Sequence, residues 1–529
     1  MRGFATLLDR LVYTPARNDK LRLMADYFAT TPDPERGWAL AVLTGSLSLR
    51  LPFRRIMTEM IEGRIDPVLF KLSRDYVGDT AETLALLWPG PEADAETAPP
   101  SLETVIEGLS QASAAEASAL ISGWLDRLDG TERWALLKLI TGALRVGVSA
   151  RLAKTALAEW SGIDLDDIEE VWHGLTPPYP QLFAWLAGDG PRPDVERLPI
   201  FRPLMLSHAI EDPELEAIAA DDFQAEWKWD GIRVQLSTMA GEHRLFSRTG
   251  DDISGAFPDV FEELPPDSVL DGELLVMREG EVQPFNDLQQ RLNRKTVTAN
   301  MLKAYPAHIR LYDILYDDGE DVRPLSLKAR RMRLEAWYER HDPPRADLSE
   351  TLEYGDIDEL KQLWENARAT GIEGLMLKRK ESPYLSGRPK GHWYKWKRAP
   401  LTLDAVVMYA QRGSGKRSSY YSDYTFGAWR PAEDGGEELV PVGKSYFGFT
   451  DAELLELDRW VRNHTVDRFG PVRQVEPKLV FEVAFDSVHP STRHKSGVAM
   501  RFPRVHRIRW DKPADEADRL ETLVKMIEG

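Results

Sequence analysis

The hydrophobic periodicity of this chain changes twice, and these changes constrain its fold more than any other feature of the sequence. Up to about residue 195, Leu, Ala and Met recur at the spacing of amphipathic helices. After Phe201 apolar and polar residues alternate as in half-buried strands, with helical stretches between them. From about Leu401 the chain consists mostly of short strands. The pattern predicts a multidomain protein with an all-α domain over 1–198, an α+β domain with antiparallel sheets over 199–400, and an all-β domain over 401–529.

The last of these regions has the most specific pattern. Five short strand-like runs follow Leu401, and one helical stretch over 451–463 interrupts them. This combination fits a small OB-fold barrel. A chain of 529 residues is too long for one hydrophobic core, which agrees with a division into about three domains.

Composition excludes several kinds of chemistry. The chain has no cysteine, so disulfides, thiol catalysis and cysteine-ligated zinc or iron–sulfur sites are ruled out. Its ten histidines are scattered, which gives no pattern for a dedicated transition-metal site. The first residues have the pattern of an amphipathic helix and not that of a leader peptide. No apolar run approaches the roughly 20 residues that span a bilayer. We expect a cytoplasmic, monomeric protein that does not bind membranes.

The charge is unevenly distributed. The net charge is −19, which argues against a polyanionic partner, but residues 378–417 carry eleven Lys or Arg against two acidic residues. Residues 493–512 carry seven Lys or Arg against one acidic residue. Local clusters set the potential that a polyanion meets, so both stretches are candidate nucleic-acid surfaces. The alternative for either cluster alone is a solvated protein face.

Residues 226–233, with the sequence EWKWDGIR, place a lysine between two tryptophans just before a turn glycine. Alternating residues flank the stretch on both sides, which predicts two strands that meet at a tight bend. Lys228 could then act as a nucleophile, provided that apolar cover or nearby cations lower the pKa of about 10.4 that a free lysine has. Trp227 and Trp229 could supply that cover. The alternative is a β-hairpin with a surface lysine.

Four later segments supply groups that a nucleophilic lysine would need: 246–250 (FSRTG), 270–274 (LDGEL), 372–378 (IEGLMLK) and 393–397 (WYKWK). They offer two carboxylates that could hold Mg²⁺ or a ribose hydroxyl, and cations that could bind phosphate. Such a set suits attack on the α-phosphate of a nucleotide, where positioning and charge neutralisation do most of the work. Each segment alone could be an ordinary β-turn, but five in order make that interpretation poor.

The sequence KWDGIR at 228–233 resembles the signature of covalent nucleotidyltransferases, and the later segments resemble further motifs of that superfamily in the expected order. More narrowly, the chain resembles ATP-dependent DNA ligases of bacterial or archaeal type. Residues 144–149 (LRVGVS) resemble an element of the ligase DNA-binding domain. Residues 496–504 (SGVAMRFPR) and 509–512 (RWDK) resemble the C-terminal ligase motif, which is highly specific. The resemblance implies helical DNA-binding, adenylation and OB-fold domains in that order.

The resemblance also implies a role for individual residues. Lys228 would attack ATP and become lysine-AMP, and the AMP would then pass to a DNA 5′-phosphate and be displaced by a 3′-hydroxyl. Glu273 and Glu373 would hold Mg²⁺ or Mn²⁺, Glu273 also the ribose, and Asp511 and Lys512 would help to close over ATP. The remaining residues implied to bind the nucleotide are Glu226 at adenine, Arg233 and Arg248 at ribose and phosphates, Lys395 and Lys397 at the α-phosphate, and Arg501 and Arg504 at pyrophosphate.

The chain departs from the family pattern at two positions. Where the family commonly stacks adenine on phenylalanine, this chain has Tyr312, whose ring can stack equally well. An arginine expected about six residues before Lys395 is replaced by Pro389, and Arg388 is the nearest candidate. The string GSGK at 413–416 is a poor phosphate-binding loop, and we interpret it as a DNA-facing loop of the barrel.

The predicted substrate is nicked duplex DNA, bound largely without sequence preference and in a salt-sensitive way. The reaction would serve DNA repair, replication or recombination. An RNA ligase, an RNA-capping enzyme or a catalytically inactive nucleic-acid-binding relative are the alternatives. The long helical region and the C-terminal motif disfavour the first two, and the absence of cysteine disfavours a ligase that uses NAD and carries a cysteine-ligated zinc finger.

Overall fold

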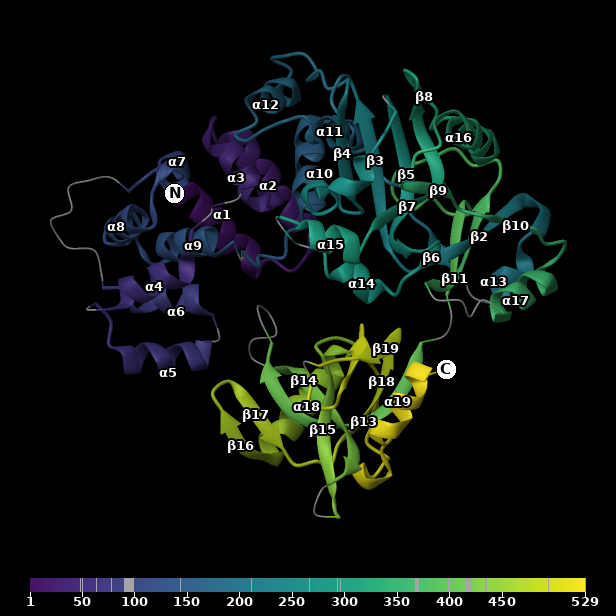
Figure 1. The fold of residues 1–529 in the computed structure, drawn as a ribbon. Coiled ribbons are helices and arrows are strands. Elements are labelled where there is room, and N and C mark those ends of the chain that lie inside the picture. The colour runs from purple at the N-terminus through teal and green to yellow at the C-terminus, as the bar shows by residue number, and fades with distance from the viewer. Residues whose placement is uncertain are drawn as a thin grey trace. The chain divides into compact units, whose positions relative to one another are not determined.

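The computed structural model describes residues 1–529 except 48, 50, 63, 78, 90–98, 143, 211, 266, 293, 295, 367–370, 398–399, 414–419, 433–434, 493 and 529. These residues form two compact units, one made of Met1–Ala156 and Ala399–Gly529 and the other of Leu157–Arg398. Helices come first, mixed helices and strands follow, and strands dominate the last region (Figure 1). The predicted order of fold classes is therefore confirmed. The boundaries predicted after residues 198 and 400 stay predictions.

The N-terminal region is helical. Its helices bury apolar stripes, and several begin at a side chain that accepts a backbone N–H, such as Asp129 at the start of α9. The helices are α1 (Arg2–Tyr13), α2 (Arg17–Thr30), α3 (Glu35–Thr44), α4 (Phe53–Ile61), α5 (Pro67–Val77), α6 (Thr80–Leu87), α7 (Leu102–Gln111), α8 (Ala114–Leu125), α9 (Gly130–Thr141), α10 (Ala150–Ser161), α11 (Leu165–Trp172) and α12 (Pro180–Ala187).

Two antiparallel sheets form the middle region. The first has the strand order β1-β12-β11-β2-β10, in which only the β1–β12 pair is parallel. Its strands are β1 (His208–Ala209), β2 (Phe223–Trp229), β10 (Thr351–Leu352), β11 (Ile372–Arg379) and β12 (Trp393–Lys397). The short helix α13 (Asp212–Ala217) and α17 (Ile357–Asn366) belong to the same part of the chain, and Leu360 of α17 packs into the apolar core of this sheet.

The second sheet follows the order β4-β3-β5-β7-β8, with β6 paired antiparallel to β5 and β9 paired parallel to β7. The helix α16 packs against β7 and inserts Leu334 and Trp337 into the core of the sheet. The strands are β3 (Ile232–Met239), β4 (Glu242–Ser247), β5 (Ser268–Arg278), β6 (Glu281–Val282), β7 (Ala307–Asp317), β8 (Glu320–Asp321) and β9 (Ala346–Leu348), and the helices are α14 (Phe285–Gln289), α15 (Ala299–Ala304) and α16 (Leu327–His341).

The C-terminal region is a curled antiparallel sheet with a helix at 451–464, as predicted, and a further helix at the C-terminus. One core of buried side chains, including Tyr424, Phe426 and Phe481, joins the strands to both helices. The elements are β13 (Leu401–Arg412), β14 (Tyr421–Pro431), β15 (Glu437–Ser445), α18 (Asp451–His464), β16 (Thr465–Phe469), β17 (Val472–Val475), β18 (Val480–Phe485), β19 (Ser487–Pro490), β20 (Val498–Arg501), β21 (Arg504–Arg509) and α19 (Leu520–Glu528).

Among the helices in the described part of the chain, none is long and apolar enough to cross a membrane.

Candidate active site

Lys228 lies where the chain passes from the first sheet to the second. β2 pairs with β10 and β11, whereas β3 pairs with β4 and β5, so the two strands do not pair with each other. The interpretation of this stretch as a β-hairpin is therefore wrong, because the bend joins two sheets. A Cβ atom on Gly231 would overlap the carbonyl oxygen of Leu274, so the close approach of the sheets at this bend requires glycine.

The ammonium group of Lys228 forms an ion pair with Glu373 of β11. The Nζ atom of Lys397 lies 3.2 Å from the same carboxylate oxygen. Burial favours the neutral form of Glu373, but the two ammonium groups outweigh this effect and hold the pKa of the carboxyl well below its usual value. Glu373 is thus ionised at neutral pH, and two lysines share its single negative charge.

Several cations gather around this ion pair. Burial and the positive charges of Lys397, Arg388, Arg248 and Lys228 lower the pKa of Lys395, which shows that these five predicted residues share one electrostatic neighbourhood. Lys395 and Lys397 alternate along β12 and therefore point to the same face of the sheet. Such a cluster is suited to neutralising a polyphosphate.

Glu273 brings a second carboxylate to Lys228 from the other sheet. Burial raises its pKa to about 8, with Glu373 and Asp271 acting in the same direction, although Lys228 and Arg233 oppose the shift. Among the described residues there is no group of three or more His, Cys, Asp or Glu placed to hold a metal ion. Two carboxyl groups that are ionised when a cation is bound are nevertheless a suitable set for Mg²⁺, which usually takes its other ligands from water and substrate phosphates.

The raised pKa of Glu273 predicts a specific dependence of stability on pH. Between about 4.3, the usual glutamate value, and about 8, the folded chain keeps a proton that the unfolded chain has lost, so stability falls as pH rises through this window. We expect Glu273→Gln to gain at least about 1 kcal/mol over the wild type between about pH 5 and pH 8. Thermal unfolding of both proteins in EDTA, without nucleotide, measures this. A difference that stays constant with pH would contradict the assignment.

Arg233 is held by protein groups. Its guanidinium binds both carboxylate oxygens of Asp271, at 3.0 and 2.6 Å, and donates to the carbonyl of Met205 and the hydroxyl of Tyr384. The predicted contacts of Arg233 with ribose and phosphate stay predictions. Sequence reasoning missed Asp271 and Tyr384, although Asp271 stands beside the glycine of the LDGEL segment that drew attention to Glu273.

Glu226 precedes Lys228 by two residues in β2 and therefore lies on the same strand face. Its carboxylate accepts hydrogen bonds from Lys378 and from Gln224, and the ring of Tyr312 lies beside Lys378. The structure thus brings the predicted adenine-binding pair, Glu226 and Tyr312, to a common neighbour. Lys378 was counted only as part of a basic cluster in the sequence.

The two tryptophans point away from Lys228, because alternate residues of a strand face opposite sides. Trp227 packs against the apolar core of the first sheet. Trp229 lies under Arg310, whose guanidinium carbon is 4.1 Å from the ring centre. The sequence leaves open whether the tryptophans cover the lysine or pack the strand, and these contacts favour packing.

Arg501 and Arg504 belong to the other unit. Arg504 donates to Asp486 at 2.9 Å, and Arg501 stacks on Phe502 with 5.2 Å between guanidinium carbon and ring centre. In the same segment Asp511 pairs with Arg509, and Lys512 donates to Asp404. Of the GSGK string, residues 414–416 lie outside the described residues.

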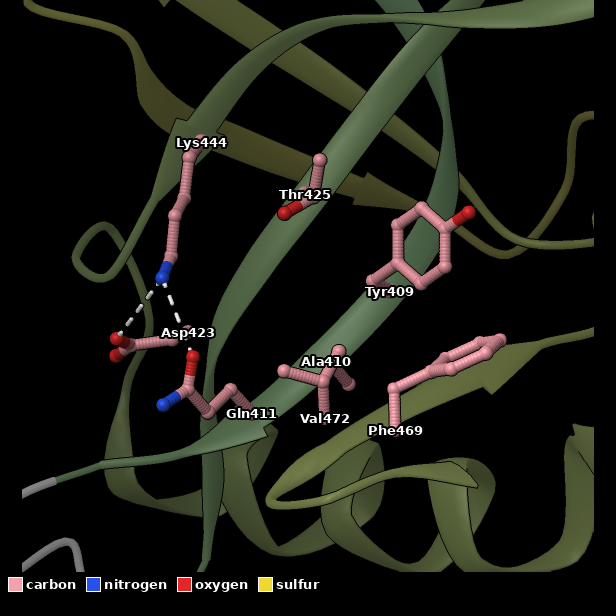
Figure 2. A pocket seen from close by; sticks show the side chains of 8 residues that line it. All are labelled: Tyr409, Ala410, Gln411, Asp423, Thr425, Lys444, Phe469 and Val472. Carbon is pink, nitrogen blue, oxygen red and sulfur yellow. Dashed lines mark hydrogen bonds and ion pairs between the residues drawn. The ribbon is translucent and has the colours of Figure 1, made fainter. Parts of the chain in front are cut away.

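A groove of about 470 Å³ lies on the C-terminal sheet, apart from the residues discussed so far (Figure 2). Tyr409 and Phe469 supply aromatic surface on one side, and Lys444 forms contacts with Asp423 and Gln411 on the other. The groove therefore combines an apolar part with a neutralised pair of charges. It contains none of the predicted catalytic or nucleotide-binding residues.

Comparisons with known proteins agree with this geometry. Residues 204–397 match the family model described as ATP dependent DNA ligase domain, and 417–512 match the ATP dependent DNA ligase C terminal region. The chain is 36% identical over 430 residues to a probable DNA ligase of Koribacter versatilis, covering 76% of this chain and 73% of that one. It is 30% identical over 548 residues to DNA ligase 1 of Korarchaeum cryptofilum, covering 100% and 98%.

A solved structure named Pmar-Lig_PreS3 resembles the whole fold, with a TM-score of 0.59 at 18% sequence identity. The match covers 96% of this chain and 99% of that one. At this identity the likeness concerns the fold alone.

Proposed function

The chain belongs to the ATP-dependent DNA ligase family, and on this premise we propose how its residues seal a nick in DNA. The enzyme uses ATP and joins DNA strands, as the family does. The observation that carries the residue-level proposal is the placement of Lys228 between a carboxylate on each sheet and the four other cations around it.

In the first step the amine of Lys228 attacks the α-phosphorus of ATP. The ammonium group first loses one proton to solvent and becomes the attacking amine. A phosphorus–nitrogen bond then forms, the bond to pyrophosphate breaks, and the nitrogen loses a second proton to solvent. Lys395 and Lys397 neutralise the α-phosphate oxygens, and Arg248 and Arg388 bind neighbouring phosphates. Glu273 and Glu373 would hold Mg²⁺, which neutralises phosphate charge when bound.

In the second step a 5′-phosphate oxygen at the nick attacks the phosphorus of lysine-AMP, which frees the amine and forms DNA-adenylate. The 3′-hydroxyl then attacks the 5′-phosphate, and AMP leaves.

We propose that Arg501 and Arg504 orient the departing pyrophosphate in the first step. We also propose that the C-terminal sheet is an OB-fold and that the enzyme acts as a monomer on nicked duplex DNA, with Mg²⁺ or Mn²⁺ as the metal ion.

One experiment tests the residue-level proposal. The full chain is incubated with α-labelled ATP, GTP or NAD and Mg²⁺, denatured, and examined for label on the protein. Label from ATP that EDTA prevents, followed by sealing of nicked DNA but not of nicked RNA, is the expected result. Label from NAD alone, or sealing of RNA alone, would contradict the proposal.

A glycine beside the site provides a further prediction. Gly374 follows Glu373 and lies opposite both Lys228 and Lys397 in the strand register. A Cβ atom there would overlap the backbone carbonyl oxygen of Trp396, so Gly374→Ala must displace β11 from β12. Because a shift of about 1 Å in a positioned group costs about 100-fold in rate, we expect adenylation of Lys228 to fall by that factor.

The rate of label transfer from ATP measures this effect. Gly123→Ala in α8 is the matched control, since its added Cβ would meet open space and its helix should gain up to about 1 kcal/mol. A folded Gly374→Ala enzyme that adenylates at the wild-type rate would show that the spacing of the strands does not position Glu373.

A further inference from the structure

Lys378 is a buried lysine at the point where the two sheets meet. Its side chain is 2% exposed, and its Nζ atom lies 3.0 Å from each carboxylate oxygen of Glu226, which is also 2% exposed. The ammonium group is 4.3 Å from the ring centre of Tyr312 and 4.9 Å from that of Trp393. Its partners therefore come from β2, β7 and β12. This arrangement does not fit a lysine that contributes to a basic surface.

The pair fixes the orientation of the Glu226 carboxylate. Lys378 binds both oxygens, and the amide of Gln224 donates to Oε1 at 2.8 Å. An ionised carboxylate only accepts hydrogen bonds, and each of its oxygens can accept two. Oε2 can thus accept one more donor while it stays bound to Lys378.

The direction of β2 relates this carboxylate to the reacting atoms. Glu226 and Lys228 are two residues apart on one strand face, a separation of about 6.6 Å along the strand. A nucleotide whose α-phosphate lies at Lys228 can then extend its base toward Glu226. The ring of Tyr312 beside Lys378 offers a surface for stacking such a base.

We propose that Lys378 is a positioning residue that sets the preference of the enzyme for adenine over guanine. It holds Glu226 as a fixed acceptor that receives the exocyclic amine of adenine. The corresponding position of guanine carries a carbonyl oxygen, which the carboxylate repels. This inference rests on the proposed function, in which Glu226 contacts the base. Lys378 itself does not contact phosphate, because Glu226 and two aromatic rings surround its charge.

Single-turnover adenylation of Lys228, followed at varied concentrations of α-labelled ATP or GTP, tests the inference. The maximal rate and the half-saturating concentration take the places of kcat and KM. For Lys378→Met we expect KM for ATP to rise and the ratio of kcat/KM between ATP and GTP to fall by about 10- to 100-fold, the value of one charged hydrogen bond. The kcat for ATP should change much less. Lys328→Met, an exposed lysine at the start of α16, is the matched control and should leave the ratio unchanged.

Loss of one partner from a buried pair can unfold a protein, so a second variant is needed. Glu226→Gln with Lys378→Met removes both charges, and an amide can donate to guanine as well as accept from adenine. We expect this double variant to fold and to use ATP and GTP with similar kcat/KM.

If either folded variant keeps the wild-type ratio of kcat/KM between ATP and GTP, the inference is wrong. The pair of Lys378 and Glu226 would then only stabilise the fold. A wild-type enzyme that forms no adduct with ATP would instead overturn the proposed function. Thermal unfolding of both variants, compared with the wild type, reports whether the fold is intact.

Discussion

Replacement of Lys228 by alanine is expected to abolish adenylation, with a loss of at least about 10⁴-fold in label transfer from ATP. Removal of a nucleophile eliminates the covalent step, and in comparable enzymes costs up to about 10⁶-fold. Lys395 and Lys397 of β12 cannot replace Lys228 as the nucleophile. Replacing Lys228 moves neither amine toward the place where Lys228 meets the α-phosphate. Label on the denatured chain, quantified against the wild type, measures the effect.

Lys228→Arg is the informative companion variant. It keeps a positive charge for Glu373, but a guanidinium stays protonated and cannot attack phosphorus. We expect it to be as stable as the wild type within about 1 kcal/mol and equally unlabelled. Both variants should still seal pre-adenylated nicks, because that step needs no lysine nucleophile. Label retained by either variant would show that another residue carries the AMP.

The sequence predicted the chemistry of the site better than its architecture. The alternation around Lys228 correctly indicated two strands, but it carries no information on the partner of each strand. Only long-range pairing places β2 beside β11 and β3 beside β5, and thereby brings Glu373 and Glu273 to Lys228 from different sheets. The same alternation, applied strictly, already places Trp227 and Trp229 on the face opposite to the lysine.

Lys378 shows why a count of charges could not find the rest of the site. In the sequence it belongs to a run of three basic residues, 378–380, and looks like part of a solvated surface. Its burial depends on Glu226, which is 152 residues away in the sequence. Both carboxylate oxygens of Glu226 accept hydrogen bonds from the ammonium group of Lys378. Asp271 and Tyr384, which bind Arg233, are likewise separated by 113 residues.

A different buried pair determines the largest expected effect on stability. Arg330 of α16 and Asp313 of β7 have fully buried side chains, and their two hydrogen bonds measure 2.8 and 3.0 Å. Arg330 also donates to the carbonyls of Leu325 and Ser382. Arg330→Met would leave the carboxylate of Asp313 buried without its cation, which costs about 3–5 kcal/mol. Because Asp313 follows Tyr312, we also expect weaker binding of ATP.

Urea unfolding followed by tryptophan fluorescence measures the change in the free energy of unfolding. Arg333→Met on the same helix is the matched control, since the Arg333 side chain is 37% exposed and its ion pairs with Asp317 and Glu320 should contribute less than about 1 kcal/mol. The double variant Arg330→Met with Asp313→Leu removes both charges and should recover most of the lost stability. If the double variant is as unstable as Arg330→Met alone, the loss comes from the bonds to Leu325 and Ser382 and from packing, and the unpaired carboxylate is not its cause.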